Sequence, residues 1–135
     1  MSIELIRRYY DAFNAGDRAA MLACVSETVE HRVNQGGTRR GRGDFAAFNA
    51  RMSNCYRERV RDLVVFEGDA PGRFAAEFTV HGTYAETDHS LPAGTSPARG
   101  QSYELPAGAF FEVEDGRIRR VSTFYNLPDW IRQIA

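Results

Sequence analysis

Hydrophobic residues recur at helical spacing in the first part of the chain. Ile6, Tyr9 and Phe13 fall at positions i, i+3 and i+7, which predicts an amphipathic helix of about three turns. Gly16 can end this helix, and Asp17 can cap a second one immediately after it. The second helix is predicted from three apolar residues at helical spacing, Met21, Leu22 and Val25.

The pattern changes to a period of two over residues 28–34. Val29, His31 and Val33 alternate there with polar residues, which predicts a half-buried strand. The Gly-Gly pair at residues 36–37 breaks the strand. Asp44 can then cap a third helix, whose apolar stripe consists of Phe45, Phe48, Met52 and Tyr56.

Four strands are predicted after the third helix, over residues 60–67, 73–84, 102–113 and 117–126. The clearest alternation runs through residues 73–84, and a loop rich in Gly, Pro and Ser follows at 86–101. Residues 127–131 close the chain as a short helix, with Pro128 at a tolerated early position. Helices that precede an antiparallel sheet predict one α+β domain over residues 1–135. Three helices and a strongly bent sheet would enclose a cone with a cavity at its mouth.

Composition and charge narrow the function classes. A chain of 135 residues, 43% of them hydrophobic, can bury the core of a single domain. The net charge of −1 gives no electrostatic case for nucleic acid. No apolar run approaches the roughly 20 residues of a membrane span, and the first residues lack the apolar core of a signal peptide, so we expect a cytoplasmic protein.

Several kinds of chemistry are excluded or disfavoured by residue type. Every basic residue is arginine, which excludes a Schiff-base lysine and a P-loop lysine. The two cysteines, Cys24 and Cys55, lack metal-ligand spacing, and the three histidines are scattered, so we expect no metal site and no cofactor. The basic segment over residues 38–44 is interpreted as a solvated loop, with attraction of an anionic substrate group as the alternative.

Five short segments carry a resemblance to a known superfamily. They are YYDAFNAGD at residues 9–17, HGTY at 81–84, PARG at 97–100, FFEV at 110–113 and DGRI at 115–118. In this order they resemble the nuclear transport factor 2-like superfamily, which includes ketosteroid isomerases and SnoaL-like polyketide cyclases. The resemblance spans nearly the whole chain. It implies a cystatin-like α+β roll, a pocket on the concave face of the sheet and a homodimer through the convex face.

Strand parity, combined with this fold, predicts which residues line the pocket. The predicted binding residues are mostly apolar with several hydroxyl groups, which suits a medium-sized hydrophobic ligand bearing a few oxygens. They are Phe13, Phe48, Met52, Tyr56, Phe78, Val80, Tyr84, Tyr103, Leu105, Ala109, Thr123, Tyr125 and Asn126.

The resemblance also suggests catalytic roles. In ketosteroid isomerases a carboxylate moves a proton while a tyrosine and a protonated aspartate hold the enolate oxygen. Tyr9 falls at the position of that tyrosine, although it can equally be a core aromatic. The base position falls on His31 or Arg32, and His31 points to the apolar side of its strand. An imidazole with a pKa of roughly 6.5 is a competent general base, while a satisfied core histidine is the alternative.

Two positions depart from the superfamily patterns. Ala109 stands where the isomerases carry the second oxyanion acid, and Asn126 stands where the cyclases carry an acidic residue. The leading hypothesis is therefore a cofactor-independent isomerase or cyclase-type enzyme that acts on a hydrophobic carbonyl compound, with His31 as base and Tyr9 as hydrogen-bond donor. One alternative is a non-catalytic binding or dimerisation module. Another is a dehydratase or an epoxide-hydrolase-like activity, and the sequence offers no clear Asp-Arg-Asp set for the hydrolase.

Overall fold

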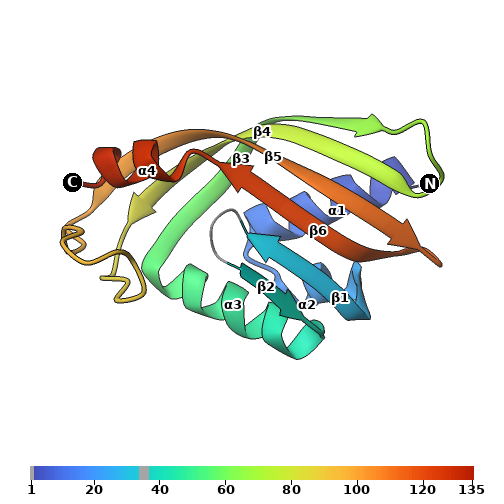
Figure 1. The fold of residues 1–135 in the computed structure, drawn as a ribbon, viewed down its shortest axis with the longest axis horizontal. Coiled ribbons are helices and arrows are strands. Elements are labelled where there is room, and N and C mark those ends of the chain that lie inside the picture. Colours follow the sequence, from blue (N-terminus) through green and yellow to red (C-terminus); the bar gives the residue numbers. More distant parts are fainter. Residues whose placement is uncertain (1, 34–36) are drawn as a thin grey trace.

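The structure, a computed structural model, describes residues 2–33 and 37–135 (Figure 1). Within these residues the helices are α1 (Ser2–Ala15), α2 (Arg18–Ala23), α3 (Arg42–Cys55) and α4 (Leu127–Gln133). The strands are β1 (Val25–Val33), β2 (Gly37–Arg40), β3 (Tyr56–Glu67), β4 (Arg73–Tyr84), β5 (Gln101–Glu114) and β6 (Arg117–Tyr125).

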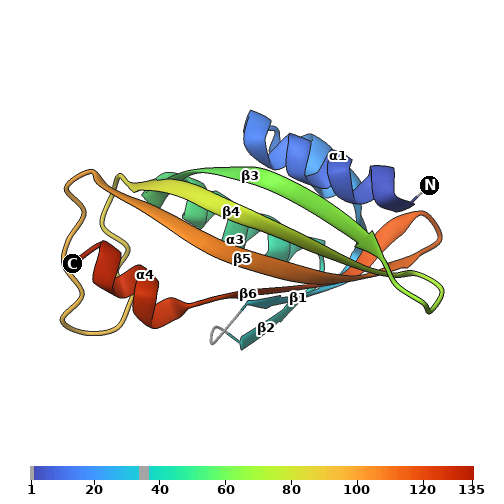
Figure 2. The ribbon, with the colours of Figure 1, turned by 90° about the horizontal axis from the view of Figure 1, so that it is seen from above.

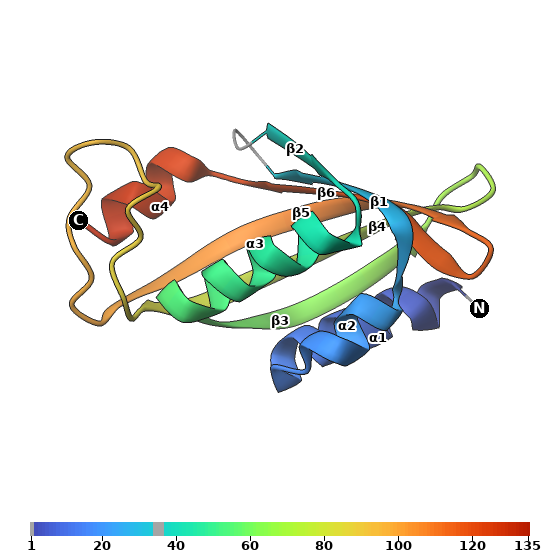
Figure 3. The same ribbon diagram turned by 90° about the horizontal axis from the view of Figure 1, so that it is seen from below.

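All six strands form one sheet in the order β2-β1-β6-β5-β4-β3. Neighbouring strands are antiparallel except β1 and β6, which run parallel. Helix α3 contacts β2 and β1 near one edge of the sheet and also β3 at the opposite edge. One helix can reach both edges only if the sheet is strongly curved. Figure 3 shows α3 lying along the sheet between β2 and β3. This arrangement confirms the predicted α+β architecture with N-terminal helices and a curved sheet.

The core lies between the N-terminal helices and the sheet. Ile6, Tyr9 and Tyr10 of α1 are buried against strand residues that include Phe78 and Phe111. Because α1 is amphipathic, its apolar side covers the sheet while its charged side stays in solvent. Within the described residues, no helix has the length and apolar character that crossing a bilayer requires.

A second buried cluster closes the opposite end of the sheet. It joins Tyr56, Tyr84, Tyr103 and Leu105 of the strands to Trp130 and Ile134 of α4. The loop over residues 85–100 lies at the same end as α4 (Figure 2). The side-chain amide of Gln101 donates to the carbonyl of Ile134, which ties the end of this loop to the end of the chain. The cluster thus packs α4 and the loop against the sheet.

Several predicted elements match the structure, and β4 coincides with the prediction over residues 73–84. The carboxylate of Asp17 caps α2 by accepting from the backbone N–H of Ala20 at 3.0 Å, as predicted. The helical assignment of Val25 is wrong, because α2 ends at Ala23 and Val25 begins β1. The cap assigned to Asp44 is also wrong: the N-cap is Gly41, and Asp44 lies in the first turn of α3.

Two further corrections concern the segments on either side of α3. Residues 38–40 belong to β2 and pair with β1, so they are not a solvated loop. Tyr56 is the first residue of β3 and not part of the stripe of α3. The end of the predicted first strand at Asn34, and Gly36 of the Gly-Gly pair, lie outside the described residues.

Candidate functional site

A cavity of about 500 Å³ lies between the concave face of the sheet, the helices and the loop over residues 85–100. Most of its lining is apolar, and a few polar groups converge on it, as in typical small-molecule sites. Ten residues predicted as catalytic or ligand-binding line it: Tyr9, Phe13, His31, Phe48, Met52, Phe78, Val80, Leu105, Thr123 and Tyr125.

Five predicted binding residues are not in the lining. The hydroxyl groups of Tyr56 and Tyr84 form hydrogen bonds with Asp88, and the hydroxyl group of Tyr103 forms one with Glu58. These three tyrosines therefore position residues that line the cavity. The remaining two have other structural roles. Ala109 is fully buried in the core, and Asn126 caps α4 by accepting from the backbone N–H of Asp129.

Glu58 and Tyr103 form a polar pair on the concave face of the sheet. In the strand register Glu58 of β3 faces Gly82 of β4, and Gly82 faces Tyr103 of β5. The ring of Tyr103 crosses over Gly82, and its hydroxyl donates to the carboxylate of Glu58. A side chain at position 82 would block this path, which explains a glycine at an inward-facing strand position.

The surroundings of Glu58 make its carboxylate an unusual acid. Burial raises the pKa of Glu58 above its ordinary value, and the hydrogen bond from Tyr103 offsets only part of this effect. The carboxylate also raises the pKa of the Tyr103 phenol, which is already raised by burial, so the phenol keeps its proton and remains the donor. A half-buried carboxyl group with a raised pKa therefore borders an apolar cavity.

Asp88 is a second carboxylate in the lining, and its environment has the opposite effect. Burial alone would raise the pKa of Asp88. The side chain and backbone N–H of Ser90, the hydroxyl of Tyr56 and the charge of Arg51 outweigh burial and lower it. Asp88 is therefore ionised at neutral pH and saturated with donors, which suits a group that fixes the loop over residues 85–100.

His31 lies on the cavity side of β1, as its strand parity predicted. Its ring makes edge contacts with Phe45 and Phe48, at centroid distances of 5.1 and 4.9 Å. Burial, assisted by the positive charge of Arg39, lowers the pKa of His31 to about 4. The imidazole is consequently neutral at pH 7, and its buried Nδ1 has no hydrogen-bond partner among residues 2–33 and 37–135.

Tyr9 lies among aromatic rings at the helical side of the cavity. It contacts Tyr10, Phe45 and Phe111 in tilted or edge-on geometry. Burial raises the pKa of Tyr9 well above that of an ordinary phenol. Tyr9 therefore remains protonated and can act only as a neutral hydrogen-bond donor or acceptor.

Sequence reasoning missed Glu58 and Asp88. Glu58 was missed because the strand over residues 60–67 was predicted to begin at residue 60, whereas the observed β3 begins at Tyr56. The alternation Tyr56, Glu58, Val60 would have placed Glu58 on the inner face. Asp88 lies in an irregular loop, where periodicity carries no information about direction.

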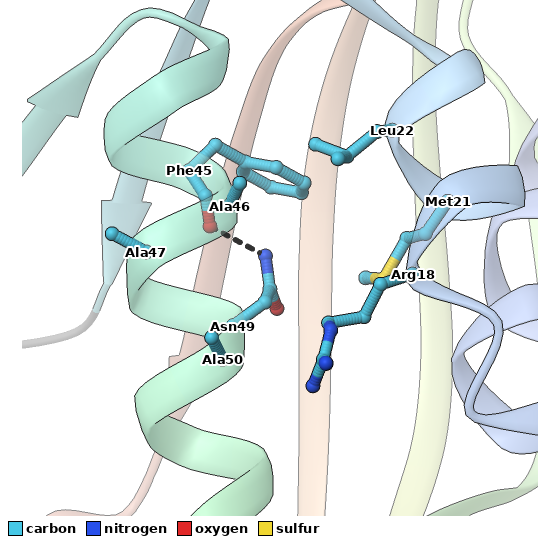
Figure 4. A pocket seen from close by; sticks show the side chains of 8 residues that line it. All are labelled: Arg18, Met21, Leu22, Phe45, Ala46, Ala47, Asn49 and Ala50. Atoms are coloured by element: carbon cyan, nitrogen blue, oxygen red, sulfur yellow. Dashed lines mark hydrogen bonds between the residues drawn. The ribbon is translucent and has the colours of Figure 1, made fainter.

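A smaller hollow of about 290 Å³ adjoins the cavity between α2 and α3 (Figure 4). Met21 and Asn49 border both spaces. The side-chain amide of Asn49 donates to the carbonyl of Phe45 at 2.8 Å, which fixes it against α3. Within the described residues, no three His, Cys, Asp or Glu side chains are arranged to hold a metal ion.

Comparisons with known proteins agree with this architecture. A structure described as a "putative polyketide cyclase" from Pseudomonas putida KT2440 shares 52% identity with a TM-score of 0.92, covering 98% of this chain and 96% of that one. A second with the same description, from Silicibacter sp. TM1040, shares 55% identity with a TM-score of 0.91 and coverages of 98% and 93%.

A more distant structure and a family model identify the fold and the family. An NTF2-like protein of unknown function from Burkholderia pseudomallei K96243 is 20% identical with a TM-score of 0.77, covers 98% of this chain and 96% of its own, and shares the fold. Among curated proteins none matches the chain. The model of the SnoaL-like domain matches residues 6–121. The chain therefore belongs to the SnoaL-like domain family, within the nuclear transport factor 2-like fold.

Proposed function

We propose that this protein is a cofactor-independent enzyme of the isomerase or cyclase type, which moves a proton on a hydrophobic carbonyl compound with Glu58 as the base. The observation that carries the proposal is the Glu58 carboxyl group, raised in pKa and held by Tyr103 beside an apolar cavity. A carboxylate desolvated in this way is a stronger base than one in water, and its pKa moves toward the working pH.

The proposed reaction begins with removal of a proton next to the substrate carbonyl. The electron pair of the C–H bond passes to the carbonyl oxygen, the proton passes to Glu58, and an enolate forms. Tyr9 is the proposed donor to the enolate oxygen, because its phenol lines the cavity and stays protonated. Return of the proton at another carbon completes an isomerisation. Attack of the enolate carbon on a second carbonyl, with protonation of the new alkoxide by Glu58, completes a cyclisation.

Glu58 is a better candidate for the base than His31. An imidazole whose conjugate acid has a pKa of about 4 is available at pH 7 but is a weak proton acceptor. Asp88 is disfavoured too, because donors saturate its oxygens and lower its pKa. The surroundings therefore raise the pKa of Glu58 and lower the pKa of Asp88. Such a separation of two pKa values is typical of acid–base pairs in enzymes.

The relatives support the same class of reaction. The two structures that are more than 50% identical to this chain are each described as a "putative polyketide cyclase". A polyketide is a chain of carbonyl groups, and its ring closure requires the enolate chemistry proposed for Glu58. The cavity of about 500 Å³ is large enough for a compound of two or three fused rings.

Deuterium incorporation tests the proposal without knowledge of the final product. The protein is incubated in D₂O with aromatic and alicyclic ketones, 1,3-diketones and naphthyl ketones, and mass spectrometry measures exchange next to the carbonyl. We expect catalysed exchange on at least one class, and a loss of about 100-fold or more in Glu58→Gln, since general base catalysis contributes about 10²–10⁴-fold. Gln keeps the shape and can still accept from Tyr103.

Two controls make the result decisive. Glu77→Gln removes a carboxylate from the exposed side of β4 and should leave exchange unchanged. The dissociation constant of the ligand for Glu58→Gln, measured from the ligand-induced shift in melting temperature, should stay within about threefold of that for the unsubstituted protein. Exchange that persists in Glu58→Gln would refute this base, and binding without exchange in any class would indicate a non-catalytic binding module.

A further inference from the structure

The pairing of β1 with β2 sorts the charged residues of both strands onto two faces. His31 faces Arg39 in the register, and Glu30 faces Arg40. Side chains of directly opposed residues lie on the same side of a sheet. Arg39 therefore shares the cavity side with His31, whereas Arg40 lies on the other side and forms an ion pair with Glu30.

Arg39 is a cation for which the described residues supply no anionic partner. Within residues 2–33 and 37–135 its guanidinium forms no ion pair, and its Nη1 is buried without a hydrogen-bond partner. Its guanidinium carbon lies 4.3 Å from the centre of the Phe48 ring. A guanidinium in the lining of an apolar cavity has lost part of its hydration, so an unpaired one is costly unless something else supplies negative charge.

Arg51, a second arginine in the lining of the cavity, has an anionic partner. Arg51 also stands over Phe48, at 5.4 Å, but it contacts the carboxylate of Asp88 at 3.4 Å and the hydroxyl of Ser90 at 2.8 Å. Arg51 is therefore neutralised by the loop over residues 85–100. In the described part of the chain, Arg39 has no such anionic neighbour. It is strand-paired with His31, whose Nδ1 also has no hydrogen-bond partner there.

We propose that the cavity binds its substrate through a carboxylate, held by Arg39 beside His31 at the Phe48 end. This inference rests on the proposed function and names the substrate class: an apolar carbonyl compound that also carries a carboxylate. A guanidinium fits a carboxylate with two parallel hydrogen bonds, and the neutral imidazole adds a donor without a competing charge. Anchoring at one end leaves the carbonyl part of the molecule free to extend along the cavity that Glu58 also lines.

A matched pair of ligands tests this binding mode. Naphthalene-2-carboxylate and naphthalene-2-carboxamide have nearly the same shape and differ in charge, and calorimetry at pH 7.5 measures both dissociation constants. We expect the carboxylate to bind the unsubstituted protein about 10- to 100-fold more tightly, the range of a charge-assisted hydrogen-bonded pair. Arg39→Gln should reduce this preference to about twofold or less, and Arg39→Lys should retain part of it.

Arg40→Gln is the matched control, because it removes the same charge one residue away on the opposite face of β2. It should keep the full preference for the carboxylate. An equal effect of Arg40→Gln would show that only the overall charge matters and would overturn the proposal. Equal binding of the two ligands, or no binding of either to the unsubstituted protein, would overturn it as well. Melting temperatures of all variants confirm that each is folded.

The outcome is separable from that of the proposed function. Glu58→Gln should keep the preference for the carboxylate, since Glu58 is not part of the anchor. If the carboxylate preference depends on Arg39 but the protein catalyses no exchange, carboxylate binding by Arg39 is supported and the proposed enzyme activity is refuted. If exchange depends on Glu58 but the protein binds both ligands equally well, the proposed enzyme activity is supported and carboxylate binding by Arg39 is refuted.

Discussion

Substitution of Gly82 by alanine tests the route by which Tyr103 reaches Glu58. A Cβ atom on residue 82 would lie 2.2 Å from Cζ and 2.4 Å from the hydroxyl oxygen of Tyr103. The ring has little room to yield, because it also packs against Tyr56 and Trp130, at centroid distances of 6.4 and 5.7 Å. Tyr103 must therefore move, and Glu58 loses its donor.

The size of the effect follows from two contributions. Overpacking a filled region costs about 1–3 kcal/mol of the free energy of unfolding. Leaving a buried acceptor without its donor costs about 1–3 kcal/mol more. Gly82→Ala should therefore lower the free energy of unfolding by about 2–6 kcal/mol near pH 7. It should also reduce any Glu58-dependent proton exchange, because the carboxylate loses its orientation.

Urea unfolding of single and double variants measures this effect. Tyr103→Ala removes the obstacle, so Gly82→Ala in that background should cost less than about 1 kcal/mol, and the two substitutions should be strongly coupled. Gly43→Ala is the control: an added Cβ there meets no atom within 4 Å, and alanine favours the helix by about 0.5–1 kcal/mol. A Gly82→Ala protein as stable as the original, or an equal loss in both backgrounds, would refute the reasoning.

The remaining predictions concern pH and assembly. Because the folded-state pKa of His31 is lowered to about 4, its contribution to stability is complete above the unfolded value of about 6.5 and is lost as the pH falls. The loss should reach about 3 kcal/mol by pH 4 and be absent in His31→Gln, as urea unfolding between pH 4 and 7.5 would measure; the same slope in both proteins would contradict it. Phe110 and Phe124 are about half exposed and contact each other at 5.8 Å, so the homodimer expected through the convex face should dissociate in Phe124→Asp. Light scattering after size-exclusion chromatography measures this, and an unchanged mass, or a monomer before substitution, would count against that interface.

The elements that could be predicted from the sequence are those with long, regular alternation. In β4 twelve residues keep a period of two, and the predicted bounds match those observed. In β2 only four polar or small residues are present, so no periodicity exists, and the strand forms because β1 supplies the partner. The parallel pairing of β1 with β6 joins distant parts of the chain, which local patterns do not record.

The candidate site was partly predictable for the same reasons. The side of the strand on which His31 lies followed from alternation. Its lowered pKa comes mainly from burial and in part from the charge of Arg39, whose strand was not predicted. A stronger signal for Glu58 was present in Gly82, a glycine at an inward position of an otherwise apolar face. Such a glycine indicates close approach of another group. Asn126 could have been identified as a cap, since Pro128 and Asp129 follow it in the first turn of α4.

The titration of the Glu58 carboxyl group tests the central claim most directly. Carbon-detected NMR of the protein labelled at the glutamate side-chain carboxyl, with Glu58→Gln for assignment, gives its pKa without any ligand. The account predicts a midpoint above 4.5, the ordinary value for glutamate, and a further rise in Tyr103→Phe, because the phenol stabilises the ionised carboxylate. A midpoint at or below 4.5, or one that Tyr103→Phe leaves unchanged, would contradict the assignment of Glu58 as the tuned base.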